Sequence, residues 1–177
     1  GLDPASQRER GKRIVIPIST NVFEKEFLRI VLPVTTHFPD YEFVFVLPNK
    51  VPPFLEELLQ TWVKRHQGIP MHVVAHPRSL EELFRSAALV IGLANAPLIE
   101  LAHTKTLGLI LNIGNPSKQL RLLRFAHHGL VKMVRGQNLR PEPLTAAIKE
   151  ALAAPYPNVV IDTQGPQHTL EYFKNNL

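Results

Sequence analysis

Residues 89–100 read LVIGLANAPLIE, and this stretch decides the fold that we predict. The run from Ala88 to Ile91 is apolar and too short for a helix, which is typical of a strand covered on both faces. Gly92 follows it and marks a tight turn. The stretch therefore predicts a buried strand that runs through a turn into a helix.

The second half of this stretch has the features of a helix start. Pro97 suits the first helical position, with Asn95 or Ala96 before it as the cap. Free backbone N–H groups at such a start attract anions, above all phosphate. Asn95, Ala96 and Leu98 are therefore candidate ligand contacts. Glu100 lies one turn further along, where it can accept hydrogen bonds from a polar ligand.

Strand and helix signals alternate along the rest of the chain. Strands are predicted at residues 13–18, 42–47, 71–75, 88–91, 109–113 and 131–134. Helices are predicted from Asn21 to about Val34, between Pro52 and Gly68, from Ser79 to Ala87, from Pro97 to about Thr106, and at 118–127 and 141–153. A short apolar run at 159–161 and a terminal helix at 166–175 complete the prediction.

Caps and breakers indicate where several of these helices begin and end. Asn21 and Glu24 resemble a capping box with Asn21 as the cap, and Ser79 and Glu82 form a second one. Gly129 is predicted to end its helix as a C-cap.

Two further residues are expected to disturb or end helices. Pro33 falls near the end of the first helix and is expected to kink or fray its last turn. Gly108 is expected to end the helix that begins at Pro97.

Six strands separated by connections of helix length indicate an α/β fold. We predict a doubly wound, mostly parallel six-stranded sheet with helices on both faces, a Rossmann-like arrangement. With the common order 3-2-1-4-5-6, ligands bind where the chain reverses direction, at the carboxyl ends of strands one and four. This rule selects Ser19, Thr20 and Asn21, together with the 93–97 turn. The turn Gly114–Gln119 is the nearest neighbour.

Length and composition limit the alternatives. A chain of 177 residues suits one domain, which we place at 13–177, with the polar residues 1–12 as a linker or expression remnant. No cysteine is present, which removes disulfides, thiolate nucleophiles and cysteine-ligated zinc. No apolar run reaches the ~20 residues that a membrane span needs, and no signal peptide is recognisable. We expect a cytoplasmic protein.

Charge and motif patterns argue against several function classes. The net charge of +5 is scattered, and no stacking aromatics accompany it, so nucleic acid is not an expected partner. No HExxH motif or paired histidine spacing is present, so no metal site is expected. No GxSxG elbow indicates a serine hydrolase. No catalytic residue is assigned from these patterns.

Three segments resemble a known family. Residues 79–119, SLEELFRSAALVIGLANAPLIELAHTKTLGLILNIGNPSKQ, are similar to the carboxyl half of GT-B-type sugar-nucleotide enzymes. FPDYEFVFVLP at 38–48 and IDTQGPQHTLEYF at 161–173 resemble that family's second strand and closing helix. The resemblance is strongest to the UDP-sugar hydrolases of pseudaminic (nonulosonic) acid synthesis, often described as spore-coat polysaccharide proteins. The lipid-II-forming glycosyltransferase is more distant.

The resemblance implies a domain that binds UDP or a UDP-sugar and needs no further cofactor. The phosphates are expected near Asn95 to Leu98, and the ribose hydroxyls at Glu100. Ser117 and Gln119 are expected to face the sugar or a phosphate. In this family an amino-terminal half supplies the catalytic base, so a domain of the same parent chain is an expected partner. This half alone is expected to be inactive.

The same residues leave a second interpretation open. The family usually carries glycines in the turns where this chain has 18–21 (ISTN) and 94–96 (ANA). Side chains in those turns restrict the close approach of backbone to phosphate, which glycine permits. The alternative is a non-catalytic interaction domain that kept the fold and lost the ligand.

Overall fold

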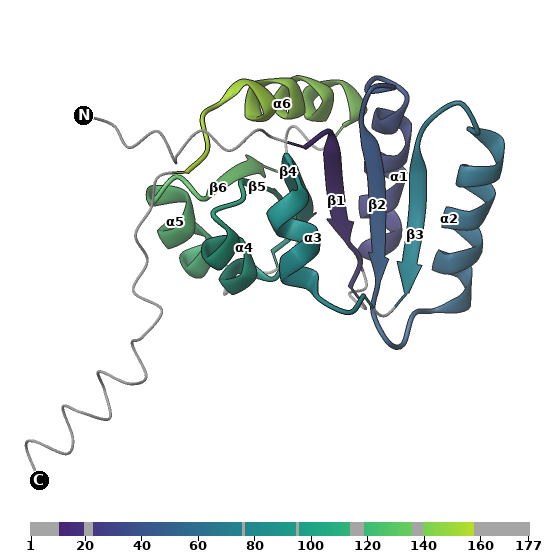
Figure 1. The fold of residues 1–177 in the computed structure, drawn as a ribbon, viewed down its shortest axis with the longest axis horizontal. Coiled ribbons are helices and arrows are strands. Elements are labelled where there is room, and N and C mark those ends of the chain that lie inside the picture. Colours follow the sequence, from purple (N-terminus) through teal and green to yellow (C-terminus); the bar gives the residue numbers. More distant parts are fainter. Residues whose placement is uncertain are drawn as a thin grey trace, which may run out of the picture.

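The computed structural model describes residues 11–19, 23–75, 77–94, 96–113, 119–135 and 140–157. Within them, a single six-stranded sheet has the order β3-β2-β1-β4-β5-β6, and each strand is parallel to its neighbours (Figure 1). The strands are β1 (Arg13–Pro17), β2 (Glu42–Leu47), β3 (Met71–Ala75), β4 (Leu89–Leu93), β5 (Gly108–Asn112) and β6 (Val131–Arg135). The helices are α1 (Glu24–Thr35), α2 (Pro53–Arg65), α3 (Leu80–Ser86), α4 (Leu98–Thr104), α5 (Gln119–His127) and α6 (Pro141–Ala153). The predicted α/β, doubly wound class and strand order are confirmed.

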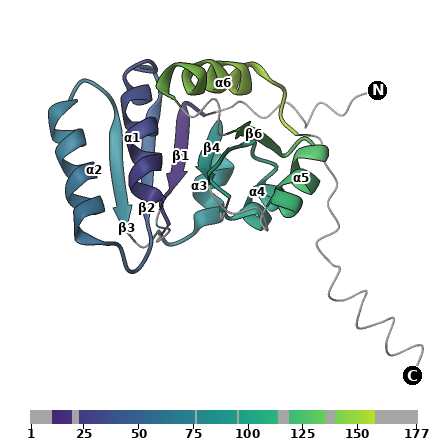
Figure 2. The same ribbon diagram turned by 180° about the vertical axis from the view of Figure 1, so that it is seen from behind.

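Side chains of alternate strand residues fill two separate cores, one on each face of the sheet. Ile14 and Ile16 of β1 belong to the core beneath α1, α2 and α6. Val15 belongs to the core beneath α3, α4 and α5. Figure 1 shows α3 and α4 in front of the sheet, and Figure 2 shows α1 in front of the opposite face. Central strands buried on both faces explain why β1 and β4 are nearly all apolar.

The sequence misplaced the start of α1. This helix begins at Glu24, its N-cap is Phe23, and no side chain caps it. The predicted capping box with Asn21 as cap is therefore wrong, because the Glu24 carboxylate accepts a hydrogen bond from Ser19 instead. The helix also continues for two residues beyond Pro33.

The boundaries around α4 also differ from the prediction. Gly92 lies inside β4, where it pairs with Ile110, rather than in the turn. Pro97 is the N-cap of α4 and not its first residue. The helix ends at Thr104, because Lys105 adopts the left-handed conformation (φ 53°, ψ 32°) that closes it.

Gly108 consequently has a different role from the predicted helix end, since it is the first residue of β5. A Cβ there would lie 2.8 Å from Leu101 Cδ1, so glycine lets α4 pack closely on β5. Two other predictions are confirmed. Ser79 Oγ accepts the Glu82 N–H at 3.1 Å, and Gly129 follows α5 with a φ of +74°. The predicted run at 159–161 and helix at 166–175 lie outside the described residues.

Candidate functional site

The carboxyl ends of β1, β4 and β5 lie side by side, because these strands are neighbours in a parallel sheet. This edge is the point at which the strand order reverses, and doubly wound sheets bind their ligands there. Of the predicted contacts, Ser19, Ala96, Leu98 and Glu100 are described and come from this edge. Thr20, Asn21, Asn95 and Ser117 lie outside the described residues. Gln119 begins α5, and only its backbone is described.

Ser19 and Glu24 form a hydrogen-bonded pair at the end of β1. Ser19 Oγ donates to Glu24 Oε2 at 2.5 Å, and the Ser19 backbone N–H also donates to this carboxylate. Glu24 is only 1% exposed, and its Oε1 has no hydrogen-bond partner among the described residues. Burial raises the pKa of Glu24, and the two hydrogen bonds from Ser19 oppose that shift in part.

Glu24 is a polar group that sequence reasoning treated only as part of a cap. The signal that identifies it is its spacing from Phe27 and Val31, which are both buried. Residues three and seven positions apart on a helix share one face, so Glu24 lies on the apolar face of α1. A glutamate at such a position needs a polar partner, and Ser19 supplies it.

In the described part of the β4–α4 turn, two of the predicted contacts, Ala96 and Leu98, have buried side chains. The Ala96 N–H donates to the Leu93 carbonyl at 2.8 Å, which closes the turn. Ala96 is 9% exposed and Leu98 only 1%, so both side chains pack inward. A Cβ on Gly92 would come within 3.1 Å of the Ala96 Cβ, so glycine makes room for this packing. At Ala96 and Leu98, a ligand would therefore meet backbone groups only.

Glu100 lies in the first turn of α4 and is partly buried. Its carbonyl accepts a hydrogen bond from Thr104 Oγ1 at 2.8 Å, which is a contact within the helix. Its carboxylate forms no ion pair in the part of the chain that the structure describes. Ligand binding by this carboxylate stays a prediction from the sequence.

Asn112 is a second group that sequence reasoning did not select. It is the last residue of β5, and its Oδ1 is buried without a hydrogen-bond partner. Within the described ranges, Glu24 Oε1 and Asn112 Oδ1 are the two buried side-chain atoms in this condition. Glu24 follows β1 and Asn112 ends β5, and these two strands flank β4. Unpaired buried polar atoms are rare in proteins, and two at one sheet edge indicate a place where a polar ligand or water completes the bonding.

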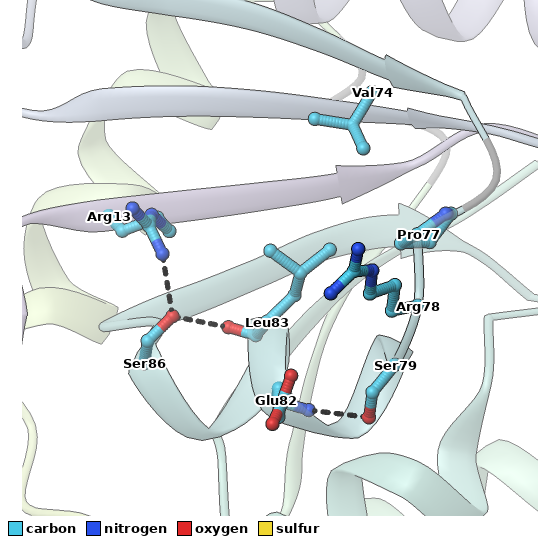
Figure 3. Close-up of a pocket in the computed structure, with 8 residues that line it drawn as sticks. All are labelled: Arg13, Val74, Pro77, Arg78, Ser79, Glu82, Leu83 and Ser86. Atoms are coloured by element: carbon cyan, nitrogen blue, oxygen red, sulfur yellow. Dashed lines mark hydrogen bonds between the residues drawn. The ribbon is translucent and has the colours of Figure 1, made fainter.

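A separate groove of about 370 Å³ lies between α3 and the sheet (Figure 3). Its lining residues are Arg13, Val74, Pro77, Arg78, Ser79, Glu82, Leu83 and Ser86. None of the predicted ligand contacts is among them. Arg13 begins β1, at the opposite end of that strand from Ser19, and it already pairs with Glu42 and donates to Ser86. The groove is therefore not part of the candidate site.

The described residues also bear on metal binding and on membrane spanning. They hold no group of three or more histidine, aspartate or glutamate side chains that is arranged to bind a metal ion. No helix that the structure describes has the length and apolar character needed to cross a membrane.

Comparison with known proteins gives a fold but no family. No protein-family model matches the sequence, and no curated protein matches it either. Among solved structures, MurG of Acinetobacter baumannii matches with a TM-score of 0.74 and 13% identity, covering 96% of this chain and 51% of MurG.

Two solved epimerases give similar results. The UDP-GlcNAc 2-epimerase of Methanocaldococcus jannaschii, in complex with UDP-GlcNAc and UDP, has a TM-score of 0.62 and 13% identity over 94% of this chain and 46% of its own. The UDP-GlcNAc 2-epimerase of Neisseria meningitidis, bound to UDP-GlcNAc, has a TM-score of 0.58 and 15% identity over 95% and 45%. The chain thus spans about half the length of these proteins. Its fold is the Rossmann-like fold of a GT-B carboxyl half.

Proposed function

We propose that this chain is a nucleotide-sugar-binding domain that takes UDP or a UDP-sugar at the carboxyl ends of β1, β4 and β5. The observation that carries the proposal is the Glu100 carboxylate, which forms no ion pair among the described residues and lies in the first turn of α4, beside the strand-order reversal. A carboxylate in this place suits the two hydroxyls of a ribose, because it accepts hydrogen bonds and donates none. The UDP-GlcNAc complexes of two proteins with this fold support the choice of ligand.

The phosphates are proposed to lie against the backbone of the β4–α4 turn. Ala96 and Leu98 point inward, so the turn offers N–H groups there without a competing polar side chain from either residue. Asn95, Thr20, Asn21, Ser117 and Gln119 remain proposed contacts from the neighbouring loops. Asn112 Oδ1 joins them as an acceptor at the end of β5.

The domain is proposed to be one half of a larger enzyme. The three solved structures compared above are about twice as long as this chain, and an amino-terminal half would complete the cleft. Following the sequence resemblance, the parent is a hydrolase or glycosyltransferase of surface-polysaccharide or nonulosonic-acid synthesis, located in the cytoplasm. The catalytic base would come from the other half.

Calorimetric titration with UDP and amide NMR shifts together test the proposal. We expect measurable binding at millimolar or lower UDP, with the largest shifts in residues 92–100. Absence of binding at millimolar UDP would contradict the proposal, and so would shifts confined to the groove beside α3.

The alternative of a non-catalytic interaction domain has one observation in its favour. The α4 helix has only seven residues, and its N-cap Pro97 forms no side-chain cap hydrogen bond, which makes it a weaker anion site than a long capped helix. This alternative predicts that the chain binds neither UDP nor UDP-GlcNAc and instead forms a stable complex with a protein. The same titration separates the two functions.

A further inference from the structure

The Ser19–Glu24 pair joins the end of β1 to the start of α1. Glu24 is the first residue of α1, a helix of twelve residues, yet its carboxylate points back to Ser19. Glu24 is 1% exposed, whereas Ser19 is only partly buried. A ligand at this edge therefore reaches the Ser19 hydroxyl, and the glutamate lies behind it.

No cation compensates the buried carboxyl in the described part of the chain. Arg13 and Glu42, at the amino ends of β1 and β2, pair with each other. The remaining charged groups lie on α1, before α2, and on α6, which packs against α1, and they are Lys25, Glu26, Arg29, Lys50, Glu142, Lys149 and Glu150. Lys25 lies over the Phe54 ring and Glu150 pairs with Lys132, and none forms an ion pair with Glu24. An uncompensated buried carboxylate favours its neutral form.

The position of the proton determines what Ser19 offers to a ligand. When Glu24 is ionised, the Ser19 hydroxyl hydrogen is used by Glu24 Oε2. When Glu24 is neutral, a proton on Oε1 has no acceptor, because that atom has no partner among the described residues. A proton on Oε2 can instead be donated to Ser19 Oγ. The Ser19 hydrogen is then released and can be donated to another acceptor.

We propose that Ser19 and Glu24 form a proton-linked anion-binding pair, in which neutral Glu24 donates to Ser19 Oγ and Ser19 donates its own hydrogen to a phosphate oxygen of the ligand. Binding of the phosphate takes up one proton, which resides on Glu24 Oε2. Glu24 is a positioning residue in this arrangement, since it acts through Ser19. The inference rests on the proposed function for its ligand.

Two observations support this arrangement in addition to the hydrogen bonds that each Glu24 oxygen can form. Burial raises the pKa of Glu24, which brings its protonation closer to neutral pH. The α1 N-terminus also lies at this point, and the N–H groups of a first helical turn, which have no partner within the helix, favour a bound anion. The buried oxygen without a partner distinguishes this helix start from an ordinary one.

The test measures the affinity for UDP-GlcNAc between about pH 5 and about pH 8. UDP-GlcNAc is chosen because both of its phosphates stay singly charged over that range, whereas the terminal phosphate of UDP titrates. For the natural chain we expect affinity to rise as pH falls, by at most about tenfold per pH unit. Calorimetry in two buffers of different ionisation enthalpy should show uptake of up to about one proton per ligand.

Three variants test whether the proton taken up on binding resides on the Ser19–Glu24 pair. In Glu24→Gln the side-chain amide donates to Ser19 Oγ at every pH, so we expect tight binding. Its affinity should not depend on pH, except through the titration of histidines. Ser19→Ala should bind about tenfold more weakly at acid pH, because the hydrogen bond to phosphate is lost. Glu26→Gln, an exposed neighbour on the same helix, is the matched control and should keep the natural pH profile. Thermal unfolding checks that each variant is folded.

The outcomes separate this inference from the proposed function. Binding of UDP-GlcNAc by the natural chain with the same pH slope as Glu24→Gln overturns the inference alone. Weaker binding by Glu24→Gln than by the natural chain at neutral pH also overturns it, because the ionised carboxylate would then be the group that the ligand needs. If the natural chain binds no UDP-GlcNAc at millimolar concentration, both fail together.

Discussion

The connections that follow β1 and β4, the two central strands of the sheet, are held by different kinds of interaction. After β1 the chain places a buried glutamate against a serine, and the polar side chains interact with each other. After β4 it buries Ala96 and Leu98, and the turn is closed by a backbone hydrogen bond. The first connection keeps a polar group at an energetic cost, whereas the second is held by apolar packing.

This difference predicts a different role for each connection. Apolar packing fixes the β4–α4 backbone in one position, because protein cores are close-packed and tolerate little displacement. A buried polar pair contributes less to the stability of the fold than apolar packing does, but it can change its protonation state and the direction of its hydrogen bond. The β4 connection is therefore expected to contribute stability and backbone contacts, and the β1 connection to contribute sensitivity to pH.

The largest expected effect comes from removing the packing of the β4 connection. Leu98→Ala should lower the free energy of unfolding by about 3 kcal/mol, since it leaves a cavity at a fully buried position. Urea denaturation measures this change. Ile99→Ala, at the adjacent residue that is 54% exposed, is the control and should change stability by less than about 0.5 kcal/mol. Equal losses in the two variants would show that the α4 start is not packed as described.

A smaller effect is expected from the one polar side chain described in the first turn of α4. Glu100→Ala should weaken UDP binding by about tenfold, because hydrogen bonds to the ribose hydroxyls are lost. Its melting temperature should change little, as the carboxylate forms no ion pair in the described residues. Calorimetry and thermal unfolding provide the two measurements.

Glu57→Ala serves as the control for this substitution. It removes an exposed glutamate from α2, on the other face of the sheet. UDP affinity should be unchanged in this variant. If Glu100→Ala bound UDP as tightly as Glu57→Ala does, the role of Glu100 in ribose binding would be wrong.

The fold was predictable because its signals are repeated along the chain. Each buried strand is a short apolar run, and each helix between strands has apolar residues on one face. Boundaries were less accurate where tertiary contacts decided them. Glycine is a common residue at helix ends, yet Gly108 instead allows close packing against Leu101. The helix ends at Lys105, in a left-handed conformation that its sequence does not signal.

The edge that the switch-point rule selects follows from the strand order, which the structure confirms. That a ligand binds at this edge, and that Glu100 contacts it, both stay predictions. Leu98 was selected as a contact, but its buried side chain leaves only its backbone for a ligand. Glu24 and Asn112 were missed because an unpaired buried oxygen is a property of packing between segments distant in sequence.

The smallest expected effect concerns the β1 connection, and it is measured through the stability of the fold alone. Burial raises the pKa of Glu24 in the folded chain above its value in the unfolded chain. At about pH 4 and below, both forms of the chain hold the proton, and the carboxyl costs little. As pH rises through the folded pKa, the buried group must ionise in place, and its contribution to stability is lost.

Glu24→Gln removes this ionisation and should stabilise the chain at neutral pH by about 1 kcal/mol, the usual scale for a buried polar group without a partner. The difference from the natural chain should disappear toward acid pH and grow as pH rises, which urea denaturation at a series of pH values measures. Glu26→Gln should show no such trend, because Glu26 is exposed. A Glu24→Gln chain that is less stable at neutral pH would mean that the ionised carboxylate stabilises the fold, and the contrast between the two connections would then be lost.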